Sequence, residues 1–129
     1  MNNILVCGAG SVGKRHIKNL ISFGENVLVW RERKSKLKEI RDLFGVQTCS
    51  DLEKALNRSK AVIIATATDC HVNIAIEALK LKKSVFIEKP VSNNLKNIDQ
   101  LINLSKYNIV EVGHQLRTHP SIKILKSNI

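Results

Sequence analysis

Short apolar runs alternate with stretches of helical periodicity along this chain, and this alternation constrains the fold more than any other feature. Continuous β-branched runs are typical of strands that are buried on both faces, as in parallel sheets. Such runs occur at residues 4–7, 27–30, 61–65, 85–87 and 109–112. The chain is therefore expected to contain a largely parallel β-sheet.

Apolar residues at helical spacing fill the gaps between these runs, each set lying on one face of an expected helix. The sets are Ile17, Leu20 and Ile21; Leu37, Ile40 and Phe44; Val72, Ala75, Ile76 and Leu79; and Leu95, Ile98, Leu101 and Ile102. Gly24 and Gly45 follow the first two sets and fit the position after a helix end, where φ is positive. Ser50 and Glu53 fit a capping box that opens a short helix, and residues 46–48 fit a short extra strand. This order predicts a doubly wound α/β domain with a mainly parallel sheet of about six strands and right-handed crossovers.

The composition fits a single folded domain. The chain has 129 residues, of which 43% are apolar and 25% charged, as is ordinary for a soluble protein. No apolar run approaches the ~20 residues of a membrane span, and the first residues lack the features of a signal peptide. Cys7, Cys49 and Cys70 lack CxxC spacing, so we expect reduced thiols, no metal site and a cytoplasmic protein.

The formal net charge of +10 fits an anionic partner, such as a nucleic acid, an anionic surface or a phosphate-bearing ligand. Aromatic residues make up only 4% of the chain, which disfavours the base-stacking surfaces of single-strand binding. The basic residues gather at residues 31–41 and 80–83, in patterns typical of solvated helix faces. A basic nucleic-acid-binding domain is therefore the least favoured functional hypothesis, behind the two that are developed below.

A glycine-rich turn follows the first expected strand and opens the first expected helix. Residues 8–13 read Gly-Ala-Gly-Ser-Val-Gly, the GxGxxG pattern of dinucleotide-binding Rossmann domains, in the strand–turn–helix context that it requires. Gly8 permits the tight turn, Gly10 lets a pyrophosphate approach the backbone, and Gly13 lets the helix pack close to the strand. The helix start at Ser11 and Val12 would present free N–H groups to the phosphate. The pattern predicts NAD(P) binding, and the alternative is a tight turn without a ligand.

The end of the second expected strand bears on which dinucleotide is bound. NAD sites place an Asp or Glu about 20 residues after the glycines, where it binds the ribose 2′-hydroxyl. Here Arg31 lies near that position and is followed by Glu32 and Arg33. A guanidinium pairs well with a 2′-phosphate and stacks on adenine, so we expect NADP as the cofactor. NAD is the alternative, because a shift of one residue in register would make Glu32 the ribose ligand.

Three further stretches resemble one protein family. They are residues 65–71 (Ala-Thr-Ala-Thr-Asp-Cys-His), residues 88–90 (Glu-Lys-Pro) and residues 112–120 (Val-Gly-His-Gln-Leu-Arg-Thr-His-Pro). Together with the glycine turn, they resemble the N-terminal half of the glucose–fructose oxidoreductase, inositol dehydrogenase and rhizopine catabolism (Gfo/Idh/MocA) family. The resemblance covers essentially the whole chain, and Glu-Lys-Pro directly after a strand is its most specific motif.

The resemblance implies roles for individual residues. Lys89 matches the family lysine that lies beside nicotinamide and substrate and is often called catalytic; there it could hydrogen-bond a substrate hydroxyl. The positions that match residues around the cofactor are Thr66, Ala67, His71, Glu88, Lys89, Gln115 and Arg117. The sequence departs from the family pattern at Ala67, Thr68 and His114, where Pro, Asn and an aromatic residue are usual. Pro90 matches a proline that commonly follows a cis peptide bond, whereas His16 and His119 have no predicted partner and are expected to be structural.

The resemblance also implies a longer parent protein, whose second half supplies most of the substrate site and the contacts of a homo-oligomer. We therefore expect residues 1–117 to form the NAD(P)-binding Rossmann domain and residues 118–129 to begin a truncated second domain. The parent enzyme would transfer hydride between nicotinamide and a hydroxyl or carbonyl carbon of a sugar or cyclitol. The 129 residues alone would bind the dinucleotide without turnover. A stand-alone dinucleotide-sensing module is the alternative.

Overall fold

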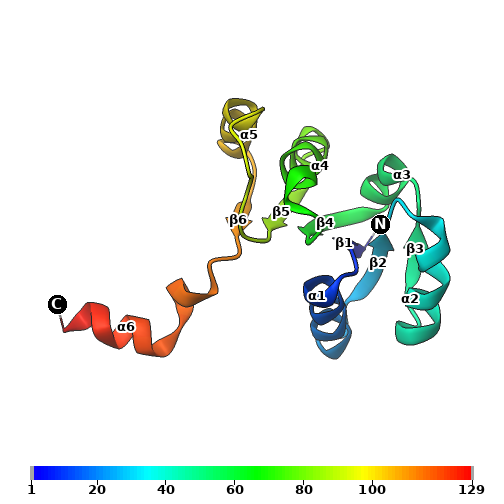
Figure 1. Cartoon of the computed structure of the whole chain (residues 1–129), viewed down its shortest axis with the longest axis horizontal. Helices are drawn as coiled ribbons and strands as arrows, with labels where there is room; N and C mark the ends of the chain where they lie inside the picture. Colours follow the sequence, from blue (N-terminus) through cyan, green and yellow to red (C-terminus); the bar gives the residue numbers. More distant parts are fainter. Residues whose placement is uncertain (1, 129) are drawn as a thin grey trace.

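A computed structural model describes residues 2–128 as one six-stranded parallel sheet with helices on both faces (Figure 1). The strand order is β3-β2-β1-β4-β5-β6, and every neighbouring pair is parallel. The strands are β1 (Asn3–Cys7), β2 (Asn26–Trp30), β3 (Gln47–Cys49), β4 (Ser59–Ile64), β5 (Ser84–Ile87) and β6 (Val110–Val112). The predicted α/β class and the predicted parallel sheet are both confirmed.

The helices divide between the two faces of the sheet. Figure 1 shows α1 and α2 on one side, and α3, α4 and α5 on the other. The helices are α1 (Ser11–Ser22), α2 (Leu37–Phe44), α3 (Leu52–Asn57), α4 (Thr68–Lys80), α5 (Ile98–Ser105) and α6 (Pro120–Ser127), with the 3-10 turns η1 (Lys34–Lys36) and η2 (Gln115–Thr118).

Each face of the sheet has its own apolar core. Leu5 and Cys7 of β1 belong to the core under α3, α4 and α5, whereas Val6 packs with Ile17 of α1 and Ile40 of α2. Successive side chains of a strand point to opposite faces, so a strand that is covered on both faces needs a continuous apolar run. This requirement explains why the runs in the sequence predicted these strands.

The strand order also determines which edge of the sheet can bind a ligand. From β1 the chain adds β2 and β3 on one side, then returns to add β4, β5 and β6 on the other. Ligands of open α/β sheets bind where this order reverses, outside the carboxyl ends of the strands. The glycine turn after β1 and the loops after β2 and β4 lie at that place.

One predicted helix was wrong at its start. Leu95 was expected on the buried face of a helix, but it is 88% exposed, and α5 begins only at Ile98. The side chain of Asn94 accepts a hydrogen bond from the backbone N–H of Lys96, and Asn97 adopts a left-handed conformation with φ 62°. Asn favours such local turns over helix, so the segment before Ile98 forms a turn.

The cap of α3 was also predicted one residue too early. Asp51, not Ser50, caps the helix, and its carboxylate accepts a hydrogen bond from the backbone N–H of Lys54 at 3.0 Å. This bond lowers the pKa of Asp51. A carboxylate is at least as good an N-cap as a hydroxyl, and its charge also interacts favourably with the helix dipole. The expected positive φ angles of Gly24 and Gly45 are confirmed, at 76° and 65°.

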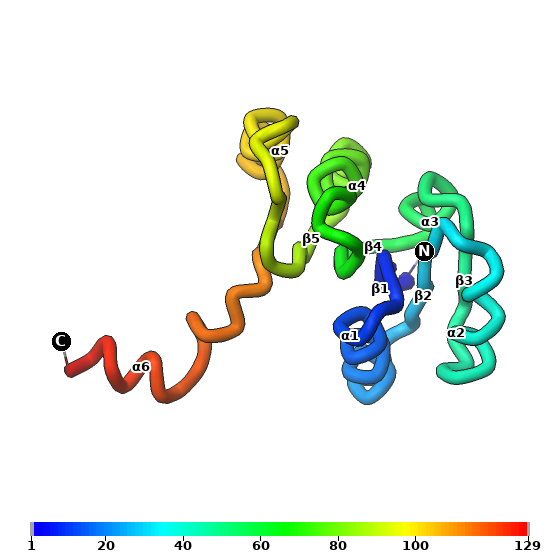
Figure 2. The backbone as a smooth tube through the Cα atoms, viewed as in Figure 1, coloured from blue at the N-terminus to red at the C-terminus, as the bar shows by residue number. Residues whose placement is uncertain are grey.

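The last helix, α6, projects away from the sheet. Figure 2 shows the backbone leaving β6, passing through η2 and running outward into α6, and no residue of α6 is buried. His119 caps this helix by accepting a hydrogen bond from the backbone N–H of Ser121. Among residues 2–128, no helix is both long and apolar enough to cross a bilayer.

Candidate functional site

Two cavities lie at the carboxyl ends of the strands. The first, here called the β2–β4 cavity, has a volume of about 420 Å³ and is lined by residues 8–10, 30–33, 65–67 and Cys70. The second, here called the β5–β6 cavity, has a volume of about 630 Å³. It is lined by Val12, Arg15, His16, Phe86, Glu88, Lys89, residues 111–115 and Thr118. The glycine turn contributes to the first cavity and α1 to the second, so the N-terminus of α1 contributes to both sides of the site.

Gly8 and Gly13 are required by the fold around the turn. Gly8 has φ 93°, and a Cβ there would lie 2.5 Å from the carbonyl oxygen of Ala65. A Cβ on Gly13 would lie 2.2 Å from the carbonyl oxygen of Gly8. Their lack of a side chain therefore allows α1 to pack directly against the turn and the end of β4.

Gly10 differs, because no described residue occupies the space beside it. A Cβ on Gly10 would meet no atom of residues 2–128 within 4 Å. Gly10 is the N-cap of α1, where no side chain accepts a hydrogen bond and the first turn holds no acidic residue. The first N–H groups of a helix lack partners within it and carry partial positive charge. The open surface at Gly10 can therefore admit an anionic group such as a pyrophosphate.

The segment after β2 brings three charged side chains to the β2–β4 cavity. Arg31 is half-buried, whereas Glu32 and Arg33 are exposed. Within residues 2–128, none of the three forms an ion pair. Burial, and then the charges of Asp69 and Glu32, raise the pKa of the Cys70 thiol, so the Glu32 carboxylate lies close enough to Cys70 to influence it.

His71 joins the loops that follow β4 and β5. It is the fourth residue of α4 and is only 2% exposed. Its Nδ1 lies 2.9 Å from the carbonyl oxygen of Pro90, and its Nε2 lies 3.0 Å from that of Thr66. The ring thus sets the spacing between the two loops at the edges of the cavities. The peptide bond between Lys89 and Pro90 is cis, as the resemblance implied.

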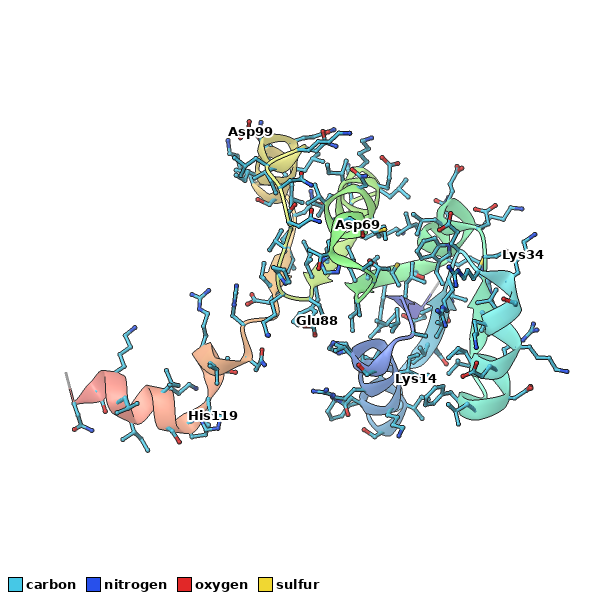
Figure 3. All side chains as sticks on the ribbon, viewed as in Figure 1. Lys14, Lys34, Asp69, Glu88, Asp99 and His119 are labelled. Carbon is cyan, nitrogen blue, oxygen red and sulfur yellow. The ribbon has the colours of Figure 1, made fainter. Side chains whose placement is uncertain are left out.

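The β5–β6 cavity holds Lys89 and a pair that the sequence did not reveal. Lys89 is exposed at the cavity wall. Glu88 lies between β5 and α1 (Figure 3), where its Oε1 is 2.7 Å from Nε2 of His16. His16, which was expected to be structural and without a partner, therefore belongs to the candidate site. One signal was available, because Val12 and His16 are four residues apart and share one face of α1.

The structure brings most of the predicted site residues to the two cavities. Those that line a cavity are Gly8, Gly10, Val12, Arg31, Glu32, Arg33, Thr66, Ala67, Glu88, Lys89 and Gln115. Ser11, Gly13, His71 and Arg117 line neither one. Within residues 2–128, no three His, Cys, Asp or Glu side chains cluster as metal ligands would.

This geometry is accompanied by a match to one protein family. The profile of an oxidoreductase family with an NAD-binding Rossmann fold, Gfo/Idh/MocA, matches residues 2–114. The chain belongs to the Gfo/Idh/MocA family. The resemblance predicted from the glycine turn and the Glu-Lys-Pro motif is thereby confirmed, and the matched residues form the family's NAD-binding Rossmann domain.

Characterised members and solved structures of similar proteins are considerably longer than this chain. The myo-inositol 2-dehydrogenase of Thermotoga maritima is 30% identical over 131 residues, which cover 96% of this chain and 39% of that protein. A probable dehydrogenase from Thermotoga maritima has a similar structure, with a TM-score of 0.87 at 30% identity, covering 97% of this chain and 39% of the other. A scyllo-inositol dehydrogenase from Lactobacillus casei, solved with NAD(H) and scyllo-inositol, shares the fold at 22% identity, with a TM-score of 0.84 over 98% of this chain and 40% of its own.

Proposed function

We propose that the two cavities together hold one nicotinamide dinucleotide. The adenosine half lies in the β2–β4 cavity, the pyrophosphate at the N-terminus of α1, and the nicotinamide half in the β5–β6 cavity. The open surface at Gly10 between the two cavities is the observation that carries this proposal. Helix N-termini with free N–H groups favour phosphate there.

We propose NADP as the preferred cofactor. Arg31 is the first residue after β2 and has no carboxylate partner among residues 2–128, so its guanidinium is available to a 2′-phosphate. Arg33 adds a second positive charge at the same cavity. Glu32 supports the alternative, because its carboxylate could accept hydrogen bonds from an unphosphorylated ribose and would repel a phosphate.

The proposed reaction is hydride transfer between the cofactor and a carbon that carries a hydroxyl or carbonyl group. Bound nicotinamide supplies the group that accepts or donates the hydride. Lys89 is the proposed catalytic residue, because its ammonium can donate a hydrogen bond to the substrate oxygen and stabilise the charge that develops there. Its exposed position in the β5–β6 cavity, next to Glu88, is consistent with contact to both molecules.

The other predicted residues have proposed places around the cofactor. We propose that Thr66 and Ala67 contact it from the loop after β4, that Glu88 binds the nicotinamide ribose, and that Gln115 and Arg117 contact it from η2. For His71 we propose an indirect role, since its ring is buried beneath the loops that it joins.

The proposed substrate of the complete enzyme is a sugar or cyclitol, by analogy with the inositol dehydrogenases among the relatives. We place the domain boundary at residue 117, and full-length members are expected to form homo-oligomers. The 129 residues, which span 39% of a characterised relative, are expected to bind the dinucleotide without turnover. Sustained production of reduced nicotinamide by the purified chain, with inositols or sugars as substrates, would contradict this expectation.

The cofactor proposal can be tested by fluorescence. The chain has a single tryptophan, Trp30, which lines the β2–β4 cavity. Its emission overlaps the absorption of reduced nicotinamide, so energy transfer reports binding directly. Titrations with NADPH and NADH give the two dissociation constants for the wild-type chain and for the Arg31→Ala, Glu32→Gln and Lys34→Ala variants.

We expect tighter binding of NADPH than of NADH. Arg31→Ala should remove about tenfold or more of the NADPH affinity, as loss of a charge-assisted hydrogen bond implies, and should weaken NADH binding less, since NADH loses only the stacking on adenine. Lys34→Ala is the matched control, since Lys34 does not line the cavity and its loss should leave the preference intact. Tighter binding of NADH, weakened by Glu32→Gln, would instead assign NAD and contradict the NADP proposal.

A further inference from the structure

His16 and Glu88 form a polar pair on the wall of the β5–β6 cavity. Nε2 of His16 lies 2.7 Å from Oε1 of Glu88, and the two side chains are 22% and 20% exposed. A carboxylate only accepts hydrogen bonds, so Nε2 of the ring carries the proton that is donated. The ring also lies edge-on to Phe86, with centroids 5.6 Å apart and planes 67° apart. This contact restricts the orientation of the ring from which the hydrogen bond is donated.

The second carboxylate oxygen of Glu88 lies beside Gly113, whose lack of a side chain leaves room for it. A Cβ on Gly113 would lie 3.2 Å from Oε2 of Glu88 and 3.0 Å from Cζ of Phe86. A side chain at position 113 would therefore press on the carboxylate. Within residues 2–128, no group donates a hydrogen bond to Oε2. Oε2 is thus a free acceptor at the wall of the cavity that contains Lys89.

Contacts outside this pair hold the backbone around Glu88 and α1. The backbone N–H of Glu88 donates to the carbonyl of Ile64 at 2.9 Å, which fixes the main chain at the end of β5. The buried side chain of Ile17 and the close approach of Gly13 to the turn hold α1 in place. The hydrogen bond from His16 therefore acts first on the side chain of Glu88.

We propose that His16 is a positioning residue for the nicotinamide half of the site. It holds the carboxylate of Glu88 so that Oε2 accepts a hydrogen bond from a hydroxyl of the nicotinamide ribose. This inference rests on the proposed function, since it requires that half of the dinucleotide to lie in the β5–β6 cavity. Without His16, the Glu88 side chain samples several rotamers, and ordering it when the ligand binds costs conformational entropy.

The test compares two ligands that differ only in the nicotinamide half. One is NADPH or NADH, whichever binds the wild-type chain more tightly. The other is the matching fragment that ends at the diphosphate, 2′-phosphoadenosine 5′-diphosphate or ADP. The fragment occupies the β2–β4 cavity and the N-terminus of α1 but does not reach Glu88. Calorimetry gives both dissociation constants for His16→Ala, for His16→Gln and for the control Lys18→Ala, whose exposed side chain lines neither cavity.

We expect His16→Ala to weaken binding of the whole dinucleotide about tenfold and to leave fragment affinity within twofold of wild type. His16→Gln retains an N–H donor at similar reach and should restore most of the lost affinity. Equal losses for both ligands, or none for either, would overturn the positioning role. Failure of the wild-type chain to bind either dinucleotide would contradict the proposed function itself, so the two failures are distinguishable.

Gly113→Ala provides an independent test on the other side of the carboxylate. The new methyl group would press on Oε2 of Glu88 and on the Phe86 ring, without removing the donor on His16. It should therefore reproduce the selective loss of dinucleotide affinity, with fragment affinity retained. Full dinucleotide affinity in a folded Gly113→Ala chain would contradict the proposal that the orientation of this carboxylate matters.

Discussion

Replacement by alanine should affect different properties at two glycines of the same turn, the stability of the domain at one and its dinucleotide affinity at the other. Gly13 is packed against protein backbone, whereas Gly10 faces open space at the N-terminus of α1. Gly13→Ala should therefore destabilise the domain. Gly10→Ala should leave the domain stable and weaken dinucleotide binding.

The magnitude for Gly13→Ala follows from the contact distance. The new Cβ would lie 2.2 Å from the carbonyl oxygen of Gly8, so the backbone must shift by about 1 Å to relieve the overlap. Overpacking costs about 1–3 kcal/mol, and contact with rigid backbone places this case at the upper end. The better helix propensity of alanine offsets about 1 kcal/mol. The net loss of about 2 kcal/mol lowers the melting temperature by about 8 °C for a domain of this size.

Gly10→Ala should cost little stability and more binding affinity. Gly10 has φ −71° and ψ −167°, which alanine adopts without strain, so the loss of stability should stay below about 1 kcal/mol. The added methyl group occupies the space that the pyrophosphate needs. We expect a loss of affinity of tenfold or more, equivalent to about 1.4 kcal/mol or more.

Thermal unfolding followed by circular dichroism and calorimetric titration with NADPH measure both effects on each variant. Helix propensity alone predicts that Gly13→Ala raises the melting temperature, so the sign of the change is decisive. A Gly13→Ala chain that melts at or above the wild-type temperature would refute the packing argument. A stable Gly10→Ala chain that binds NADPH as tightly as wild type would refute the assignment of the pyrophosphate to this turn.

Three further predictions concern the cap of α3, the buried histidine and the cavity thiol. Asp51→Ala should lower the melting temperature. The pKa of Asp51 is lowered in the folded chain. The stability that its carboxylate contributes is therefore fully present above the ordinary pKa of 3.8 and is lost as pH falls through the folded pKa. The melting temperatures of wild type and Asp51→Ala should differ above that pH and converge as pH falls below the folded pKa, and a difference that stays constant with pH would contradict the cap. His71→Leu removes the ring whose nitrogens lie within hydrogen-bonding distance of two backbone carbonyls, so at least one carbonyl loses its donor. This should cost about 1–3 kcal/mol in urea denaturation, whereas unchanged stability would mean that the ring's hydrogen bonding contributes nothing. Iodoacetamide should modify exposed Cys70 but not buried Cys7. Bound NADPH should slow the modification of Cys70, which mass spectrometry can measure. An unchanged rate of Cys70 modification would mean that the dinucleotide binds elsewhere.

The sequence predicted those features that depend on local chemistry. Apolar runs identified five of the six strands, because strands covered on both faces need continuous apolar side chains; the short edge strand β3 (Gln47–Cys49) has no such run. The glycine turn was also predictable, because its pattern lies within a single strand–turn–helix unit. Gly8 has the positive φ that such a tight turn requires. Family motifs added Glu88 and Lys89 at a strand end, where a parallel sheet brings ligand-binding loops together.

The features that were missed depend on competition between neighbours or on distant contacts. Ser50 and Asp51 are adjacent candidates for the same cap, and sequence spacing does not decide which side chain accepts the hydrogen bond. His16 and Glu88 lie 72 positions apart, so only the packing of α1 beside β5 brings them together. Such pairs are visible in three dimensions and leave almost no periodic signal in the sequence.

The central claim is that one dinucleotide lies across both cavities, with its pyrophosphate at the N-terminus of α1. Backbone amide chemical shifts, recorded on ¹⁵N-labelled chain during an NADPH titration, test this claim most directly. A dinucleotide bound in this way should give saturable shifts at Gly10, Ser11 and Val12, at Arg31 in the β2–β4 cavity, and at Glu88 in the β5–β6 cavity. Shifts confined to the lysine-rich surface of α2 and η1, or no shifts at all, would contradict it.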